Sequence, residues 1–289
     1  MKIRTAVIPA AGMGTRFLPV TKVVPKELIP VIDKPGLQYA VEEAISVGIE
    51  NVILITASGK ESLVEYFYHK QNPENYIQEK HQPVQLENLE KLTSSVNITS
   101  IVQNEQLGLG HAIACASEQI HNEPFAVILP DDLILGSTPA LKQLLDVFDT
   151  YETSVLAVQK VRIESIHKYG VIEPVAVGEN IFKVSNAVEK PTPEQAPSDY
   201  GIIGRYIFTP GILERITEAQ PGAVGEIQLT DAIADLTNYE PVYALNVDGT
   251  RHDIGTPLGM LKASIDIGIS RDDIGHELID YINKLTETH

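Results

Sequence analysis

The chain has 289 residues, of which 22 are Lys or Arg and 39 are Asp or Glu, so its formal net charge at pH 7 is −17. A surface this acidic repels a phosphodiester backbone and excludes DNA and long RNA as expected partners, whereas a small nucleotide needs only a few local cations. With 43% hydrophobic residues and no low-complexity tract, the chain can bury a large core, which excludes a disordered protein.

We also expect no targeting signal, no disulfide and no cysteine-rich zinc site. The N-terminal segment MKIRTAVIPAAG holds apolar residues for one short strand only, and no apolar run in the chain reaches the roughly 18 residues of a membrane span. The single cysteine, Cys115, cannot form an internal disulfide or a cysteine-rich zinc site. We therefore expect a cytoplasmic protein with no membrane partner.

The first half of the chain alternates strand and helix patterns. Short apolar runs predict strands, and apolar residues at helical spacing predict helices, the first of which ends at Gly48. This alternation predicts right-handed crossovers and an α/β fold with a doubly wound, mainly parallel (Rossmann-like) sheet. The predicted strands are 5–10, 51–58, 97–104, 124–132 and 153–161, and the predicted helices are 37–48, 59–70, 110–120 and 138–151.

The pattern changes in the second half. Residues 170–208 contain shorter strands with turns, which predicts a small antiparallel extension of the sheet. The polar stretch 71–98 shows no clear strand and is interpreted as an excursion that covers one sheet edge. The remaining elements are predicted as helices at 210–217 and 226–237, a strand at 242–247 and helices from there to the end.

Neither a linker nor an internal repeat interrupts the chain, so we predict a single domain over residues 1–289. Within it, residues 1–160 form mainly a nucleotide-binding half, residues 161–255 mainly the half that binds the second substrate, and residues 256–289 the C-terminal helices.

A glycine-rich loop follows the first predicted strand, in the stretch VIPAAGMGTRFLPVTKVVPKEL at 7–28. It is not a dinucleotide fingerprint, because Phe17 stands where the third glycine is required, and it lacks the Gly-Lys-Ser/Thr of a P-loop. Small residues nevertheless let the backbone approach a ligand and direct N–H groups at it. The loop therefore predicts a phosphate site built from Ala10, Ala11, Gly12 and Gly14 with the cations Arg16, Lys22 and Lys26.

This loop resembles the signature of the sugar-nucleotide pyrophosphorylases, a nucleotidyltransferase superfamily, and within it the bacterial UTP–glucose-1-phosphate uridylyltransferases (UDP-glucose pyrophosphorylases). Further matches follow in order along nearly the whole chain: LGLGHAI at 107–113, LPDD at 129–132, YGVIEP at 169–174, VEKP at 188–191, GRYIF at 204–208, GEIQLTDAI at 225–233 and DIG at 253–255. One departure is the stretch ITASGKES at 55–62, which stands where relatives usually have a Gly-Arg pair.

The resemblance implies a nucleotidyltransferase fold and transfer of a uridylyl group from UTP to glucose 1-phosphate, with Mg²⁺ as cofactor, UDP-glucose and pyrophosphate as products, and a homo-oligomer, dimer or tetramer. The chemistry explains why no Ser–His pair or general base is evident. A phosphate monoester has a second pKa of about 6, so the attacking oxygen is already anionic near neutral pH. Alignment and charge neutralisation then suffice for in-line attack without a covalent intermediate.

The resemblance also implies a role for each matching residue. Ala10, Ala11, Gly12 and Gly14 would give backbone contacts to the nucleotide, Arg16 would hold the departing β- and γ-phosphates, and Lys26 the α-phosphate. Glu27 would lie near the nucleotide, and Gln103 and Gly108 against the uracil, whereas His111 is interpreted as a packing residue. The remaining roles are Gly170, Glu189 and Lys190 for the sugar phosphate, and Asp131 and Asp253 for Mg²⁺.

Two alternatives stay open. One is the same reaction with another pair, such as dTTP or a different sugar 1-phosphate, because base choice depends on few hydrogen bonds. The other is a non-catalytic UDP-sugar sensor, which would have no physical need for four residues of the right type at the catalytic positions: Arg16, Lys26, Asp131 and Lys190.

Overall fold

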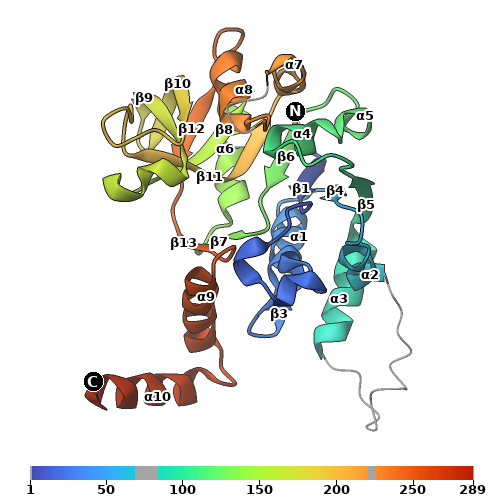
Figure 1. Cartoon of the computed structure of the whole chain (residues 1–289), viewed down its shortest axis with the longest axis vertical. Helices are drawn as coiled ribbons and strands as arrows, with labels where there is room; N and C mark the ends of the chain where they lie inside the picture. Colours follow the sequence, from blue (N-terminus) through green and yellow to red (C-terminus); the bar gives the residue numbers. More distant parts are fainter. Residues whose placement is uncertain (1, 69–83, 221–224, 289) are drawn as a thin grey trace.

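The structure, a computed structural model, describes residues 2–68, 84–220 and 225–288. Its centre is a sheet of nine strands in the described residues (Figure 1). These strands are β1 (Thr5–Pro9), β4 (Asn51–Thr56), β5 (Asn97–Val102), β6 (Phe125–Ile128), β8 (Val155–Lys160), β9 (Gly170–Gly178), β10 (Ile181–Glu189), β11 (Tyr200–Phe208) and β12 (Tyr243–Asn246). They lie in the order β5-β4-β1-β6-β11-β8-β12-β10-β9.

One half of the sheet is parallel. Strand β4 pairs in parallel with β5 and β1, and β1 pairs in parallel with β6, as the alternation of strands and helices in the sequence predicts. The chain reaches β4 on one side of β1 and β6 on the other. The carboxyl ends of β1 and β6 therefore flank a topological switch point, which is where open α/β sheets bind ligands.

The antiparallel part is larger than the small extension predicted from the sequence. Strand β11 lies inside the sheet, antiparallel to both β6 and β8, rather than at its edge. Strands β9 and β10 then form an antiparallel pair beyond β12. The sequence YGIIGRYIF fits this central place, because eight of its nine residues are buried and a strand covered on both faces reads as a continuous apolar run.

Helices cover both faces of the sheet. Alternation along β1 shows this directly, because Ala6 and Ile8 point to one hydrophobic cluster and Val7 to the other. The first cluster receives side chains from α1 (Gly36–Ser46), α2 (Ser62–Tyr68), α3 (Val84–Ser95) and α6 (Ala140–Tyr151). The second receives them from α4 (Leu109–Ala114), α5 (Ser117–Ile120), α7 (Gly211–Glu218) and α8 (Leu229–Leu236).

Three local predictions differ from the structure. The helix predicted at 110–120 is two helices, α4 and α5. The strand predicted at 124–132 ends at Ile128, shortly before Pro130, which has no N–H to donate. The excursion at 71–98 holds α3, which packs against α2 and the edge strand β5, while residues 69–83 lie outside the described residues.

Small elements close the carboxyl edge of the sheet. Strand β7 (Asp132–Leu135) pairs antiparallel with β13 (Thr250–Asp253), and this pair was not predicted. Strands β2 (Pro30–Val31) and β3 (Lys34–Pro35) form a second short ribbon. A third hydrophobic cluster, made of Val31, Leu133, Ile254 and Ala263, joins both ribbons to the helix α9 (Pro257–Ser270).

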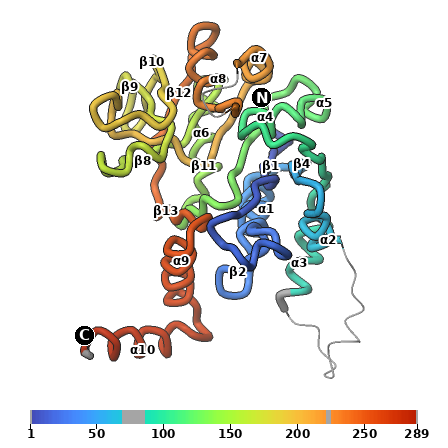
Figure 2. The backbone as a smooth tube through the Cα atoms, viewed as in Figure 1, coloured from blue at the N-terminus to red at the C-terminus, as the bar shows by residue number. Residues whose placement is uncertain are grey.

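The C-terminal helices extend away from the sheet. Helix α9 starts at a Thr256 cap, whose Oγ1 accepts a hydrogen bond from the backbone N–H of Gly259. Helix α10 (Gly275–Thr288) follows at a sharp turn and stands clear of the sheet (Figures 1 and 2). In the described part of the chain, no helix combines the length and the apolar composition needed to cross a bilayer.

Candidate active site

Two cavities adjoin at the carboxyl ends of β1 and β6. The smaller, of about 310 Å³, lies between the glycine-rich loop and the start of α4. The larger, of about 650 Å³, lies between the ends of β9 and β10, the start of α8, and β13. Four residues line both cavities: Leu109, Leu129, Asp131 and Glu226.

A lysine and an aspartate form an ion pair where the two cavities meet. Lys26 Nζ lies 2.5 Å from Asp131 Oδ2. Burial by itself lowers the pKa of the Lys26 ammonium, but the charge and hydrogen bond of Asp131 outweigh it and raise that pKa. Burial likewise raises the pKa of the Asp131 carboxyl, and Lys26 brings it below its ordinary value. Both groups are therefore charged near neutral pH.

A second carboxylate faces Asp131 from β13. A Cβ built on Gly255 would lie 3.0 Å from Asp131 Oδ2 and 3.0 Å from Asp253 Oδ1, so the two carboxylates flank this glycine. Burial raises the pKa of the Asp253 carboxyl, and the charges of Asp132 and Asp131 raise it further. Like charges held this close gain from a cation between them. Arg16 is exposed and lines the larger cavity near these acids.

A buried lysine that the sequence analysis did not single out supports the glycine-rich loop from below. Lys60 Nζ donates to the backbone carbonyls of Ala10 (2.7 Å) and Gly12 (2.6 Å) and to Glu27 Oε2 (2.8 Å). With both carbonyls turned toward Lys60, the loop keeps a fixed conformation above it. Lys60 belongs to ITASGKES, the segment in which the sequence departs from the usual Gly-Arg pair.

Removing Lys60 is expected to destabilise the fold. Burial raises the pKa of Glu27 and lowers that of Lys60, and the charge of each partner opposes the shift of the other. Breaking such a pair costs about 3–5 kcal/mol because the remaining charge stays buried and unpaired. We expect Lys60→Met to lower the free energy of unfolding by that amount in urea denaturation.

Two variants control this measurement. Lys142→Met removes a lysine from an exposed ion pair with Asp146 and is expected to cost only about 0–1 kcal/mol. The double variant Lys60→Met with Glu27→Gln leaves no unpaired charge and is expected to lose less stability than Lys60→Met alone. A Lys60→Met protein as stable as Lys142→Met would mean that the buried pair does not support the loop.

The far wall of the smaller cavity carries a hydrogen-bonded amide. Gln103 follows the end of β5, and its Nε2 lies 2.9 Å from His111 Nδ1 and 3.3 Å from the backbone carbonyl of Gly108. The loop that carries Gly108 is fixed in turn, because Leu107 O accepts from Ile227 N and Gly110 N donates to Ile227 O. Gly108 has a φ of +97°, which favours glycine.

The larger cavity has an acid and a lysine at the end of β10. Glu189 Oε2 accepts a 2.6 Å hydrogen bond from Thr230 Oγ1, and Glu189 Oε1 lies 3.0 Å from Lys190 Nζ. Lys190 has a φ of +48°, a conformation that side chains rarely adopt, and its N–H donates to Tyr169 O. This turn brings two adjacent side chains to the same cavity.

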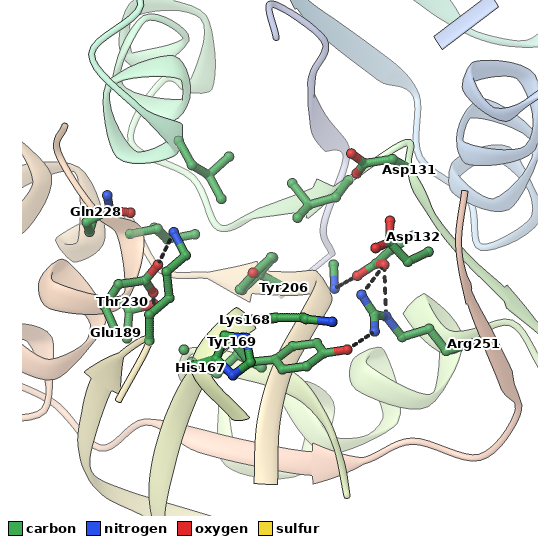
Figure 3. A pocket seen from close by; sticks show the side chains of 18 of the residues that line it. Asp131, Asp132, His167, Lys168, Tyr169, Glu189, Tyr206, Gln228, Thr230 and Arg251 are labelled. Atoms are coloured by element: carbon green, nitrogen blue, oxygen red, sulfur yellow. Dashed lines mark hydrogen bonds and ion pairs between the residues drawn. The ribbon is translucent and has the colours of Figure 1, made fainter. Parts of the chain in front are cut away.

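The opposite wall of the larger cavity is an ion-paired network. Asp132 Oδ1 accepts from Arg251 Nε (2.8 Å) and Nη2 (2.5 Å), and its Oδ2 accepts from Gly204 N (2.8 Å). Arg251 Nη1 also donates to Tyr169 Oη (3.0 Å). Figure 3 shows Asp131, Asp132 and Arg251 on one side of this cavity and the Glu189 region on the other. Asp132 thus joins the three strands β7, β11 and β13.

Most of the residues singled out by sequence lie at one of the two cavities. The smaller is lined by Ala11, Gly12, Lys26, Glu27, Gln103, Gly108 and Asp131. The larger is lined by Arg16, Asp131, Gly170, Glu189, Lys190 and Asp253. Arg16 therefore lines the larger cavity together with residues of the second half of the chain, whereas Lys26 lines the smaller one.

The expectations for two backbone groups, Ala10 and Gly14, need correction. Ala10 does not offer its backbone to a ligand, because its N–H donates to Ile55 O and its carbonyl accepts from Lys60. Gly14 lies outside both cavities, and it is required for packing, since its φ is +63° and an added Cβ would lie 2.9 Å from Lys26 Cβ. Gly170 lines the larger cavity, but an added Cβ would lie 2.3 Å from Thr230 Oγ1, so packing already demands glycine there.

The sequence analysis missed several residues that line the cavities. Some of these residues lie inside motifs that the sequence analysis quoted, so the motifs could have identified them as candidate site residues. These are Tyr169 in YGVIEP, Tyr206 in GRYIF, and Glu226, Gln228 and Thr230 in GEIQLTDAI. Arg251 had no such signal, because its partner Asp132 is distant in the sequence. Lys60, which supports the loop without lining a cavity, lies in ITASGKES, a stretch quoted only as a departure.

The fold and the two adjoining cavities indicate an enzyme of the nucleotidyltransferase class, and the comparison with known sequences indicates the same class. The nucleotidyl transferase family matches residues 5–268, and the chain belongs to that family. It is 44% identical over 281 residues to the UTP–glucose-1-phosphate uridylyltransferase YngB of Bacillus subtilis (strain 168), covering 97% of this chain and 95% of that protein. It is 43% identical over 284 residues to UTP–glucose-1-phosphate uridylyltransferase 2 of Staphylococcus saprophyticus, covering 98% of each.

Solved structures give the same relationship. The chain resembles a crystal structure of UDP-glucose pyrophosphorylase complexed with UDP-glucose, with a TM-score of 0.87, 39% identity, and coverage of 93% of this chain and 100% of that one. It also resembles the UTP-bound enzyme from Acinetobacter baumannii, with a TM-score of 0.85, 33% identity, and coverage of 98% and 100%. A glucose-1-phosphate thymidylyltransferase from Bacillus anthracis, at 22% identity and a TM-score of 0.70, shares the fold.

Proposed function

We propose that this protein transfers the uridylyl group of UTP to glucose 1-phosphate, giving UDP-glucose and pyrophosphate. The observation that carries the proposal is the placement of the Lys26–Asp131 pair where two cavities adjoin, one lined by the glycine-rich loop and Gln103, the other by Glu189 and Lys190. The relatives at 42–44% identity are named for this reaction.

In this proposal, the smaller cavity holds the nucleoside and the α-phosphate. Ala11 and Gly12 offer the loop backbone, Gln103 and Gly108 face the base, and Lys26 neutralises charge that develops on the α-phosphate during the attack. Arg16, which has no hydrogen-bond or ion-pair partner among the described residues, binds the departing pyrophosphate. Glu27 serves the nucleotide indirectly through Lys60, which it holds under the loop.

The larger cavity would hold glucose 1-phosphate. Glu189 accepts hydrogen bonds from sugar hydroxyls, and Lys190 can turn from Glu189 to the sugar phosphate because its side chain is half exposed. The phosphate oxygen is already anionic, so the site needs no general base. The site contributes by holding the attacking oxygen in line with the α-phosphorus. The two substrates would meet beside Asp131, which lines both cavities.

Mg²⁺ is the cofactor that these acids fit. Among the described residues, no group of three or more His, Cys, Asp or Glu side chains could hold a metal on its own. Asp131 and Asp253 flank Gly255 with two hard carboxylates, and Mg²⁺ commonly takes one or two carboxylates with substrate phosphates and waters. When bound, the ion would supply positive charge at the triphosphate. Asp131 would then contact both Lys26 and the ion through its two carboxylate oxygens.

The test is pyrophosphate release from the purified protein. We expect release that requires UTP, glucose 1-phosphate and Mg²⁺ together and that stops when EDTA is added. Replacing UTP by dTTP at equal concentration should give a lower initial rate, and a preference for dTTP would overturn the uridylyl assignment. Binding of UDP-glucose without any release of pyrophosphate would identify a non-catalytic sensor instead.

The homo-oligomer expected from the sequence resemblance stays a prediction. Its support here is the set of exposed apolar side chains on the two C-terminal helices, which stand clear of the sheet (Figure 1). These are Leu258, Leu261 and Ile269 on α9 and Ile279, Tyr281 and Leu285 on α10.

A further inference from the structure

We propose that His111 is a positioning residue that decides which base the smaller cavity accepts. The geometry points to an imidazole that fixes the Gln103 amide with its nitrogen turned away from the cavity and its oxygen left to meet the base. The inference rests on the proposed function only in taking the smaller cavity as the base site. It differs from the expectation, made from the sequence, that His111 is a packing residue.

The orientation of the Gln103 amide follows from its neighbours. The carbonyl of Gly108 can only accept, so the side-chain atom 3.3 Å from it must be the amide nitrogen rather than the amide oxygen. The same nitrogen lies 2.9 Å from His111 Nδ1, which must then be the unprotonated, accepting nitrogen of the ring. Both amide hydrogens are thereby used, and neither is left for a ligand.

The amide oxygen is the group left over. Gln103 is only 5% exposed and lines the smaller cavity, and its Oε1 has no hydrogen-bond partner in the described part of the chain. An oxygen in this position can only accept. Uracil presents a ring N–H and satisfies it, whereas cytosine presents a bare ring nitrogen at the same place and leaves two acceptors facing each other. A site that leaves a buried polar group unpaired rejects the wrong ligand strongly.

Two hydrogen bonds hold the Gln103 amide in this orientation, and the one to His111 is the stronger. The Gly108 carbonyl is fixed by the pairing of its loop with Ile227, but at 3.3 Å it is the longer hydrogen bond of the two. Without an acceptor at the His111 position, the amide can rotate by half a turn and present its nitrogen to the cavity. The cavity would then accept a bare ring nitrogen as readily as a ring N–H.

The experiment compares binding of UTP, CTP and dTTP by isothermal titration calorimetry with Mg²⁺ present. The wild-type protein is expected to bind UTP at least about tenfold more tightly than CTP. His111→Leu and His111→Ala, which remove the acceptor, should each reduce this UTP/CTP ratio by about tenfold. His111→Asn, whose Oδ1 can replace Nδ1 as acceptor, should keep most of the ratio.

The ratio of UTP to dTTP affinity distinguishes a loss of Gln103 positioning from a general loosening of the cavity. Uracil and thymine present the same ring N–H and carbonyls, so this ratio should stay unchanged in all three variants even where the UTP/CTP ratio falls. Equal wild-type binding of UTP and CTP would overturn the inference, as would a UTP/CTP ratio that His111→Leu and His111→Ala leave intact. Failure of the wild-type protein to release pyrophosphate would overturn the proposed function alone, since the binding ratios need no turnover.

Discussion

Lys26→Ala is expected to reduce turnover by about 10²–10³-fold, the effect of losing one preorganised electrostatic donor at a reacting centre. Lys26 Nζ is held by Asp131 at the junction of the two cavities, and Asp131 keeps it protonated near neutral pH. Its charge is therefore already in place when negative charge develops on the α-phosphate. The measurement is the initial rate of pyrophosphate release at saturating UTP and glucose 1-phosphate.

The control for this variant is Lys142→Ala, which removes an exposed lysine on α6 that lines neither cavity, and it should leave turnover unchanged. Unfolding in urea should show that Lys26→Ala keeps its fold, because Lys26 is partly exposed and its loss leaves Asp131 free to meet water or cation. A large loss of stability with a nearly normal rate would make Lys26 a structural residue and remove it from the proposed mechanism.

Asp131→Asn is expected to abolish Mg²⁺-dependent turnover, with a loss of about 10³-fold or more. Asn has the size of Asp but no charge, so it weakens any cation site shared with Asp253 and also removes the partner that orients Lys26. The dependence of the rate on Mg²⁺ concentration measures the first effect. Normal activity at an unchanged Mg²⁺ requirement would exclude Asp131 from the metal site.

The neighbouring acid provides the comparison. Both oxygens of Asp132 are already used, by Arg251 and by the N–H of Gly204, and the side chain is buried. Asp132→Asn should therefore lower the free energy of unfolding by weakening a buried ion pair, while the Mg²⁺ concentration that gives half-maximal rate stays close to the wild-type value. Asp131 would thus support Mg²⁺-dependent turnover, whereas the adjacent Asp132 would support the stability of the fold.

Parts of the fold and site were predictable because their causes are local. Apolar runs at 51–58 and 153–161 specify buried strands, and helical spacing at 37–48 specifies α1, whatever the rest of the chain does. The glycine-rich loop with Lys26 and the acid at Asp131 each follow directly after a buried strand. Parallel strands bring their carboxyl ends to one edge of the sheet, which is why these two segments meet.

Other features depend on partners far apart in the chain. Nothing near YGIIGRYIF says that β11 enters the sheet between β6 and β8, since strand pairing is decided by which faces can be buried together. Ala10 looked available to a ligand until Lys60, 50 residues away, was found on its carbonyl. The contact between Asp132 and Arg251 spans 119 residues, and no local pattern encodes it.

The sequence by itself therefore determined the class of fold, the glycine-rich loop proposed to bind phosphate and the residue types of the proposed reaction, because backbone sterics and periodicity act over a few neighbouring residues. Only the tertiary structure decided which of those residues share a cavity, why Gly14 and Gly170 must be glycine, and that His111 holds Gln103. These depend on side chains packed from separate elements, where distances of a few ångströms between non-neighbours set the chemistry.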